Sequence, residues 1–334
     1  MSVEATAARY PDVGRRAGFY ESFYLRACDP AARRGIWIRH TVHKRPGVEP
    51  RASVWFVLFD PENGPPYAVK QTHPAPALSA GGGDWIRIGD TRLTAKSATG
   101  SAAAEGREAS WDLSVEAQES PLFHLPRDWM YSAPVPRTKT LSPAPAARFG
   151  GRVEAGGRSV DLDGWAGMVG HNWGAQHAER WIWTHGLAFD GAAADGTWID
   201  AAFGRIKLGP WTTPWIGNGE IAIGGRRHRL GGLERTRATK VEESPNRCLF
   251  VLPGDGVTVR GEVGADRADF VAWIYSDPDG GRHDTVNCSA ARMTLNVERE
   301  GGAPVTLTTD GGAVYELGMR ERDHGVALQP FPDP

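Results

Sequence analysis

Two histidines flanked by tryptophans are the first candidates for chemistry in this chain. His171 lies in the stretch Gly164–Gly174 and His185 in Glu179–Gly186, and together these stretches hold four of the thirteen tryptophans. An imidazole titrates near neutral pH and can transfer a proton, while an indole face attracts positive charge. Counted at a period of two, both histidines share a strand face with these indoles: Trp165, Trp173, Trp181 and Trp183. Two such runs joined by four residues predict a β-hairpin.

The predicted hairpin has two interpretations. A pairing of Trp173 with Trp181 would set Trp183 against His171, because opposed residues of an antiparallel pair point to the same side. The resulting wall of indole and imidazole rings has two possible roles. It is either a packed aromatic core, in which the histidines have hydrogen-bond partners, or the lining of a ligand cavity, in which Asn172 would help to orient a ligand. A metal site built from histidines 171, 177 and 185 is disfavoured, because the loop breaks their even spacing and no carboxylate is fixed nearby. No metal is therefore predicted.

A buried carboxylate is the next candidate. The run Phe19–Ala27 alternates with period two and places Glu21 on its apolar side. A buried carboxylate needs a partner or a proton. Arg39, in the next alternating run Gly35–His43, is the nearest candidate partner. Glu21 is therefore either half of a structural ion pair or a functional acid.

The elements that must position these residues are short strands. Candidate strands recur along the whole chain between turn sequences, with 42 glycines, 24 prolines and no alternation of strand and helix. This pattern predicts an all-β fold of antiparallel barrels or sandwiches. We predict a loosely held leader over residues 1–18, one β domain over 19–148 that ends in a proline-rich connector, and a second over 149–334.

Composition excludes several classes of function. The 334 residues carry a formal net charge of -2, which gives no support for nucleic-acid binding. The three cysteines are far apart and lack metal-ligand spacing, so they predict neither a disulfide framework nor a zinc site. No apolar run is long enough to span a membrane, and the N-terminus lacks the pattern of a signal peptide. We therefore expect a cytoplasmic location, with peripheral membrane contact left open.

One motif is familiar. The segment Gly170–His171–Asn172–Trp173–Gly174 resembles the Asp-His-x-Trp-Gly signature of the carotenoid 1,2-hydratase (hydroxyneurosporene synthase) and AttH-like group. This group belongs to the calycin, or lipocalin-like, assembly, which also contains tocopherol cyclase and fungal Diels–Alderases. Further segments support the resemblance: Phe19–Ala27, Trp55–Asp60, Arg180–Trp183 and Tyr315–Gly318.

The resemblance implies a tandem of two lipocalin-like barrels with a hydrophobic cavity near their junction. It also implies isoprenoid or polyketide-like substrates handled without metal or redox cofactor, so no cofactor is expected. In the hydratase and the cyclase an acid protonates an alkene, but Gly170 stands here where the signature has its acid. The same chemistry would need another donor, and Glu21, Glu179 and Asp200 are the candidates.

Two classes of function remain. One is a cofactor-free cyclase, hydratase or isomerase that acts on a hydrophobic small molecule, and the other is a carrier or sensor of a lipid or isoprenoid. An enzyme should place a titratable group with a shifted pKa within reach of the cavity, whereas a carrier needs only apolar lining and a few hydrogen bonds. The predicted catalytic residues are His171, Glu21 and Asp200. The predicted ligand-binding residues are Asn172, Trp173, Trp181, Trp183, His185, Trp165 and Arg39.

Overall fold

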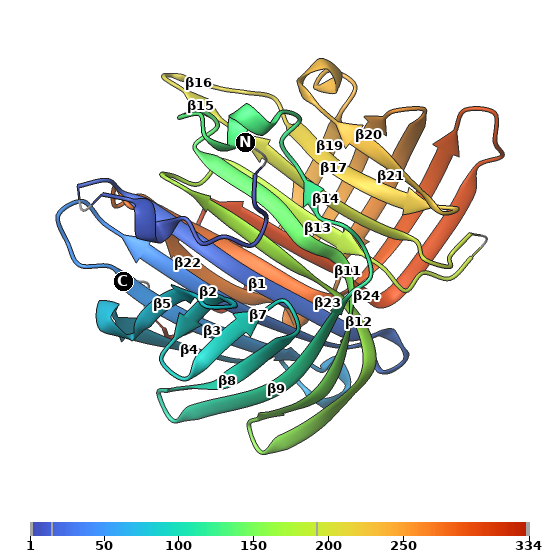
Figure 1. The fold of residues 1–334 in the computed structure, drawn as a ribbon. Coiled ribbons are helices and arrows are strands. Elements are labelled where there is room, and N and C mark those ends of the chain that lie inside the picture. Colours follow the sequence, from blue (N-terminus) through green and yellow to red (C-terminus); the bar gives the residue numbers. More distant parts are fainter. Residues whose placement is uncertain (1–2, 15, 192, 332–334) are drawn as a thin grey trace.

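The chain folds into two antiparallel β-sheets, each curled into a barrel (Figure 1). This computed structural model describes residues 3–14, 16–191 and 193–331. Within these ranges no α-helix occurs, and the only helical pieces are short 3-10 turns. The all-β prediction of two antiparallel barrels is confirmed. No helix in the described ranges is long and apolar enough to cross a membrane.

The first sheet is nearly closed. Its strands follow the order β4 (Tyr67–Pro74), β3 (Arg51–Phe59), β2 (Arg34–Lys44), β1 (Phe19–Asp29), β12 (Arg158–Gly174), β11 (Thr138–Ala155), β9 (Arg107–Ala117), β8 (Ser97–Ala104), β7 (Thr91–Thr94), β6 (Asp84–Ile88) and β5 (Leu78–Gly81), and β10 (Leu122–Phe123) pairs with β11. Side chains tie β4 to the opposite strands: Arg107 donates to the Ala68 carbonyl, and Gln71 accepts from the Ala103 amide. These bonds cover an edge that would otherwise be open to another chain.

The second sheet closes on itself. Its strands follow the order β18 (Arg226–Gly231), β17 (Ile216–Ile223), β14 (Trp198–Arg205), β13 (Arg180–Gly186), β24 (Val305–Met319), β23 (Arg282–Arg299), β21 (Val257–Gly264), β20 (Arg247–Gly254) and β19 (Lys240–Ser244), and β22 (Val271–Ser276) pairs with β23. A pairing of Leu230 with Gly254 joins β18 to β20 and completes the barrel. A separate two-stranded ribbon comprises β15 (Lys207–Leu208) and β16 (Trp211–Thr212).

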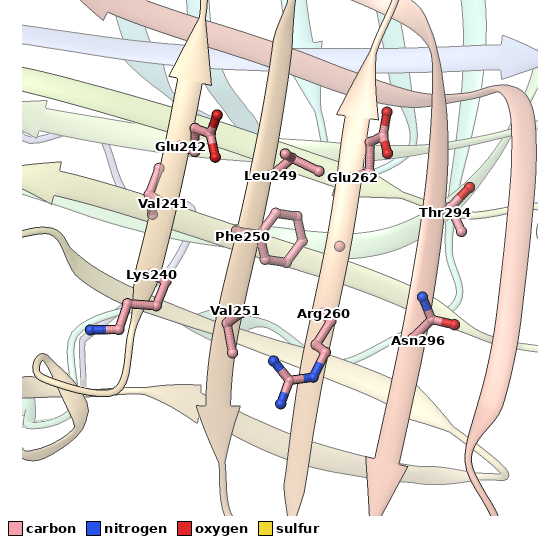
Figure 2. Close-up of a pocket in the computed structure, with 11 residues that line it drawn as sticks. Lys240, Val241, Glu242, Leu249, Phe250, Val251, Arg260, Glu262, Thr294 and Asn296 are labelled. Carbon is pink, nitrogen blue, oxygen red and sulfur yellow. The ribbon is translucent and has the colours of Figure 1, made fainter.

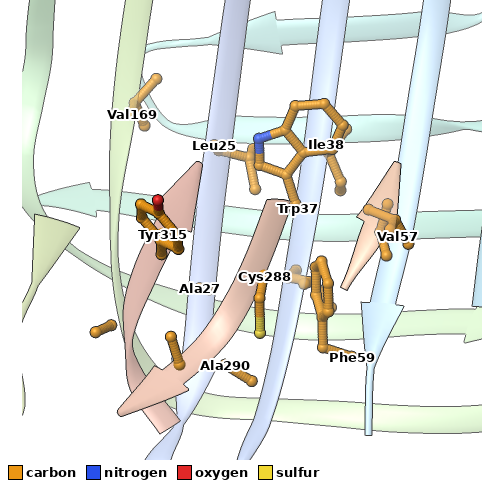
Figure 3. Packing of buried hydrophobic residues seen from close by; sticks show 14 of the residues in the cluster. Leu25, Ala27, Trp37, Ile38, Val57, Phe59, Val169, Cys288, Ala290 and Tyr315 are labelled. Atoms are coloured by element: carbon orange, nitrogen blue, oxygen red, sulfur yellow. The ribbon is translucent and has the colours of Figure 1, made fainter. Parts of the chain in front are cut away.

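The two barrels share one core. Strands β1 and β2 contact β23 and β24, and one continuous cluster of buried hydrophobic residues spans both sheets. Figure 3 shows members of this cluster from both sheets, among them Trp37 and Phe59 of the first and Cys288 and Tyr315 of the second. Strand β1 is consequently buried along both faces, with only its last residue partly exposed. A strand that alternates apolar and polar residues therefore has no solvent face here.

The central hairpin is a wrong prediction. Strand β12 pairs with β1 and β11, and β13 pairs with β14 and β24, so Trp173 and Trp181 belong to different barrels. The linker between them crosses from one sheet to the other instead of turning back. Its path is fixed at two points: Thr138 donates to the Gln176 carbonyl, and the Asp277 carboxylate accepts from the His177 amide.

The proline-rich passage is more ordered than a connector. Strand β11 begins at Thr138 and includes Pro143 and Pro145, at shifts in its register with β12. Proline cannot donate to a ladder, and a bulge is where a strand tolerates it. The predicted division after residue 148 falls within β11, and the chain changes sheets between Gly174 and Arg180.

Both chain ends pack more closely than the sequence indicates. Residues 9 and 10 of the predicted loose leader donate their backbone amides to Glu21, and Ala5 is buried beside Trp173. Beyond Arg320, Leu328 forms a bridge with Ala272, and the buried Phe331 packs near Trp273.

The core contains a neutral histidine that makes stability depend on pH. His40 is fully buried opposite Phe23 and Val54, and neither of its ring nitrogens has a hydrogen-bond partner among the described residues. Burial lowers the pKa of His40 to about 4. The unfolded chain, with its histidine near 6.5, binds more protons between these values, so stability is complete above pH 6.5 and falls as the pH drops towards 4.

We predict that His40→Leu weakens this acid sensitivity. The replacement removes a group that costs about 1.4 kcal/mol per pH unit between the two pKa values. Urea unfolding at pH 7 and pH 4.5 should show a smaller loss of stability in the variant than in the wild type. Equal losses in both proteins would show that His40 does not contribute.

Candidate functional site

A cavity of about 1360 Å³ lies where the barrels meet. Its lining comes from both sheets and from the connecting segments 124–137, 176–179 and 206–209. Aromatic, polar and charged side chains of the lining include Tyr20, Tyr24, Trp37, Arg39, His124, Asn172, His177, Trp181, Trp183 and Glu316. Its size and mixed lining suit a small organic ligand.

Strands β1, β2 and β12 supply one wall. In register, Tyr24 of β1 stands between Arg39 of β2 and Gly170 of β12. A Cβ atom at position 170 would lie 2.2 Å from the Tyr24 ring and 2.5 Å from its hydroxyl oxygen. Glycine at this position therefore makes room for the tyrosine. Two residues along both strands, the Ser22 hydroxyl donates to the Asn172 side-chain oxygen.

Strands β13, β14 and β24 supply the opposite wall. Trp183 packs edge-on against Tyr24, with ring centroids 5.0 Å apart. Each indole of this wall is fixed by a carboxylate behind it: Trp183 donates to Asp200 at 3.1 Å, and Trp181 donates to Glu316 at 3.0 Å. These hydrogen bonds hold the two indoles in place as a rigid aromatic surface.

Asp200 is buried behind this wall and stays ionised. Burial by itself would raise its pKa, but His124, His185 and the Ser142 hydroxyl outweigh burial and lower it to about 2. The His124 Nε2 atom lies 3.5 Å from the Asp200 carboxylate, and its Nδ1 atom donates to the Asn218 carbonyl at 3.3 Å. His124 lines the cavity, whereas Asp200 does not. The predicted site residue Asp200 thus positions Trp183.

A second histidine of the cavity wall has a carboxylate behind it. The His177 Nδ1 atom donates to Asp277 at 2.7 Å, and its Nε2 atom has no partner among the described residues. The ring lies between Tyr20 and Trp181, with centroid distances of 4.0 and 5.2 Å. This arrangement fixes the tautomer and leaves Nε2 able to accept a proton.

His283 also faces Asp277, at 3.6 Å. Burial lowers the pKa of His283 to about 3, so the ring is neutral. Ligand-capable atoms of His177, Asp277 and His283 lie within 4.8 Å of one another, and these are the residues from which a metal site would be built. The histidine set considered in the sequence is not assembled: His171 and His185 are bonded elsewhere.

Glu21 and His171 form a buried pair away from the cavity lining. The His171 Nε2 atom donates to Glu21 at 2.7 Å, and its Nδ1 atom donates to the Ala5 carbonyl at 3.0 Å. Glu21 also accepts from the amides of Arg9 and Tyr10. The predicted Glu21–Arg39 pair does not form, because Glu21 is opposed to Val42 in the ladder. The pair fastens the N-terminal segment to the first barrel, and its catalytic role stays a prediction.

Three other predicted ligand-binding residues lie outside the lining. His185 donates to the Pro145 carbonyl and accepts from Arg26, and burial lowers its pKa to about 4. Trp165 belongs to the shared core, and Trp173 packs with the N-terminal segment. The cavity does include four predicted residues: Asn172, Trp181, Trp183 and Arg39.

Tyr24, His124 and His177 are the residues that sequence reasoning missed. Tyr24 lies on the side of β1 opposite Glu21, which an alternating pattern assigns to solvent. His124 follows the short strand β10 in the segment treated as a connector. The available signal was the pair Tyr20 and Tyr24, two aromatics on a face that otherwise reads as polar.

A second hollow, of about 530 Å³, lies over β19, β20, β21 and β23 (Figure 2). Its lining includes exposed charged side chains: Lys240, Glu242, Arg260 and Glu262. Arg260 pairs with Glu298, and Glu262 pairs with Arg247. This solvated outer face has neither the aromatic walls nor the buried polar groups of the junction cavity.

The fold and the cavity define a class: two antiparallel barrels with a ligand-sized hollow at their junction. The fold matches that of CghA, crystallised with Sch210972, with a TM-score of 0.60, 11% sequence identity and 95% of each chain covered. It also matches a candidate AttH of Nitrosomonas europaea, with a TM-score of 0.56, 11% identity, and coverage of 94% of this chain and 97% of that one. The resemblance noted in the sequence is thereby confirmed for the fold.

Sequence relatives carry no assigned activity. The chain is 27% identical over 337 residues to the uncharacterized proteins MT0513 and Rv0493c of Mycobacterium tuberculosis, strains CDC 1551 / Oshkosh and ATCC 25618 / H37Rv. The alignment covers 95% of this chain and 91% of each relative. No family model matches the chain.

We predict that His171→Ala lowers stability and leaves binding in the cavity intact. The substitution strands a buried carboxylate, which costs roughly 3–5 kcal/mol. Chemical denaturation should report this loss, and a hydrophobic fluorescent probe should bind the folded variant as it binds the wild type. Weakened probe binding with unchanged stability would instead place His171 in the ligand site.

Proposed function

We propose that the protein binds a hydrophobic small molecule in the junction cavity and acts on it as a cyclase, hydratase or isomerase that uses proton transfer. The observation that supports binding is the junction cavity itself, with its two fixed indoles. Trp181 and Trp183 offer flat apolar surfaces, and their positions are set before any ligand arrives. Preorganised walls reduce the cost of ordering on binding.

An apolar rim supports the same proposal. Four of the large hydrophobic side chains with high exposure also line the cavity: Trp129, Val135, Leu208 and Leu233. Exposed apolar groups gathered at one opening mark a place where a hydrophobic molecule passes between solvent and protein. Peripheral membrane contact stays a prediction, and this rim is the surface that it would use.

The catalytic part of the proposal is supported by His177. Its Nδ1 atom is held by Asp277, and its Nε2 atom is left without a partner among the described residues. A histidine oriented in this way takes a proton from one carbon or oxygen of a ligand and returns it to another. Tyr24, whose pKa burial raises well above its usual value, is a neutral hydrogen-bond donor elsewhere in the same lining.

We predict that Trp183→Ala weakens ligand binding about tenfold. The change removes one aromatic wall, and stacking of this kind contributes about 1 kcal/mol beyond area burial. Titration with the neutral probe N-phenyl-1-naphthylamine gives the affinity. Trp165→Phe is the matched control, since this tryptophan lies in the core and outside the lining. Equal effects of both variants, or no binding by the wild type, would contradict the cavity as the site.

We predict that His177→Gln abolishes turnover and keeps binding. The ligand recovered by solvent extraction of the purified protein should change in mass or retention time when incubated with fresh wild-type enzyme, but not with the variant. A carrier, the alternative function, would return the compound unchanged in both incubations. Conversion at equal rates in both would remove His177 from the mechanism.

A further inference from the structure

The cavity wall contains a buried cation without a counter-ion. The Arg39 side chain is only 5% exposed. No carboxylate in the described chain lies within 4.0 Å of its guanidinium, and its Nε atom is buried without a hydrogen-bond partner. An arginine stays protonated and charged at any physiological pH, so loss of a proton cannot remove the buried charge. An unpaired buried charge destabilises the folded protein.

Aromatic rings stabilise the guanidinium only in part. Its central carbon lies 4.2 Å from the Tyr275 ring centroid, 5.5 Å from that of Trp55 and 6.0 Å from that of Trp37. Cation–π attraction is favourable, but it satisfies none of the N–H donors. The rings therefore fix the plane of the guanidinium and leave its donors for another partner.

Arg39 differs from the other charged groups of the lining. The lining has four basic residues against two acidic ones: Arg39, Arg137, Lys207 and Arg320, with Glu179 and Glu316. Glu179 pairs with Arg320, and Glu316 accepts from Trp181 and Asn287. Arg137, Lys207 and Arg320 are exposed to solvent, so the buried positive charge of the lining is that of Arg39.

Tyr24 adds a second donor next to Arg39. The two residues are directly opposed on β1 and β2, so their side chains leave the sheet on the same face. No hydrogen bond involves the Tyr24 hydroxyl among the described residues, and both side chains line the cavity. Gly170 keeps the space for this ring. A guanidinium fork with a neighbouring phenol matches the oxygens of one carboxylate.

We propose that the ligand of this cavity is a hydrophobic carboxylic acid, whose carboxylate pairs with Arg39 and accepts a hydrogen bond from Tyr24. This inference rests on the proposed binding function. A carboxylate matches the single buried positive charge of the lining one to one, whereas a phosphate dianion would exceed it. The apolar body lies along Trp181 and Trp183 towards the exposed rim.

The test compares two ligands of equal chain length, dodecanoic acid and dodecanol, by isothermal titration calorimetry at pH 8 and in displacement of N-phenyl-1-naphthylamine. The wild type should bind the acid at least about tenfold more tightly. Arg39→Gln should remove this preference and leave the affinity for the alcohol unchanged. Tyr24→Phe, which deletes only the hydroxyl, should reduce the preference several-fold. Arg148→Gln is the matched control, because Arg148 is exposed and lies outside the lining.

Stability gives an independent readout. Removing an unpaired buried charge should leave the melting temperature of Arg39→Gln unchanged or higher, whereas a structural arginine would lower it. Dodecanoic acid should raise the melting temperature of the wild type more than dodecanol does. Equal binding of acid and alcohol by the wild type would overturn the carboxylate inference and leave the proposed function standing. Binding of neither compound would overturn both.

Discussion

The requirement that buried polar groups find partners shapes the junction between the barrels. The face of the first sheet that meets the second barrel carries polar and charged side chains. Arg26 on this face receives three hydrogen-bond partners from the second barrel: His185 and the carbonyls of Ser289 and Gly312. Where the protein itself supplies such partners, the barrels are in contact. Among the described residues no carboxylate pairs with Arg39 and no group bonds the Tyr24 hydroxyl, and the cavity lies at these two side chains.

The same constraint explains why the walls are rigid. Trp181 and Trp183 each donate to a buried carboxylate, and each of those carboxylates has at least one further partner. His177 is held in the same manner by Asp277, which also fixes the linker between the barrels. Substitutions in these supporting residues should therefore alter the cavity without touching a ligand.

Much of the architecture could be predicted from the sequence, because period-two alternation and turn residues define strands locally. The alternation of Phe19–Ala27 predicts β1, and the buried position of Glu21 follows from the same pattern. Pairing between distant strands could not be predicted, because alternation does not say which neighbour a strand takes. The indole and imidazole side chains predicted to form one wall therefore lie in different places: Trp181 and Trp183 line the cavity, and His171 does not.

The site was predicted in part for a related reason. Sequence alternation assigns one face of a strand to the core and the other to water, but contact between the barrels buries both faces of β1. Tyr24 and its neighbour Arg39 became site residues through that contact. His177 was equally hidden, since a histidine in a linker acquires a role only when Asp277, a hundred residues away, is brought to it.

The most direct test of the account is a crystal structure of the protein with 12-bromododecanoic acid, with the bromine located by its anomalous signal. The account predicts one bromine peak near the rim formed by Trp129 and Leu208, and carboxylate density at Arg39. A peak inside either barrel, or over the outer face of β19–β21, would contradict the assignment of the junction cavity as the ligand site.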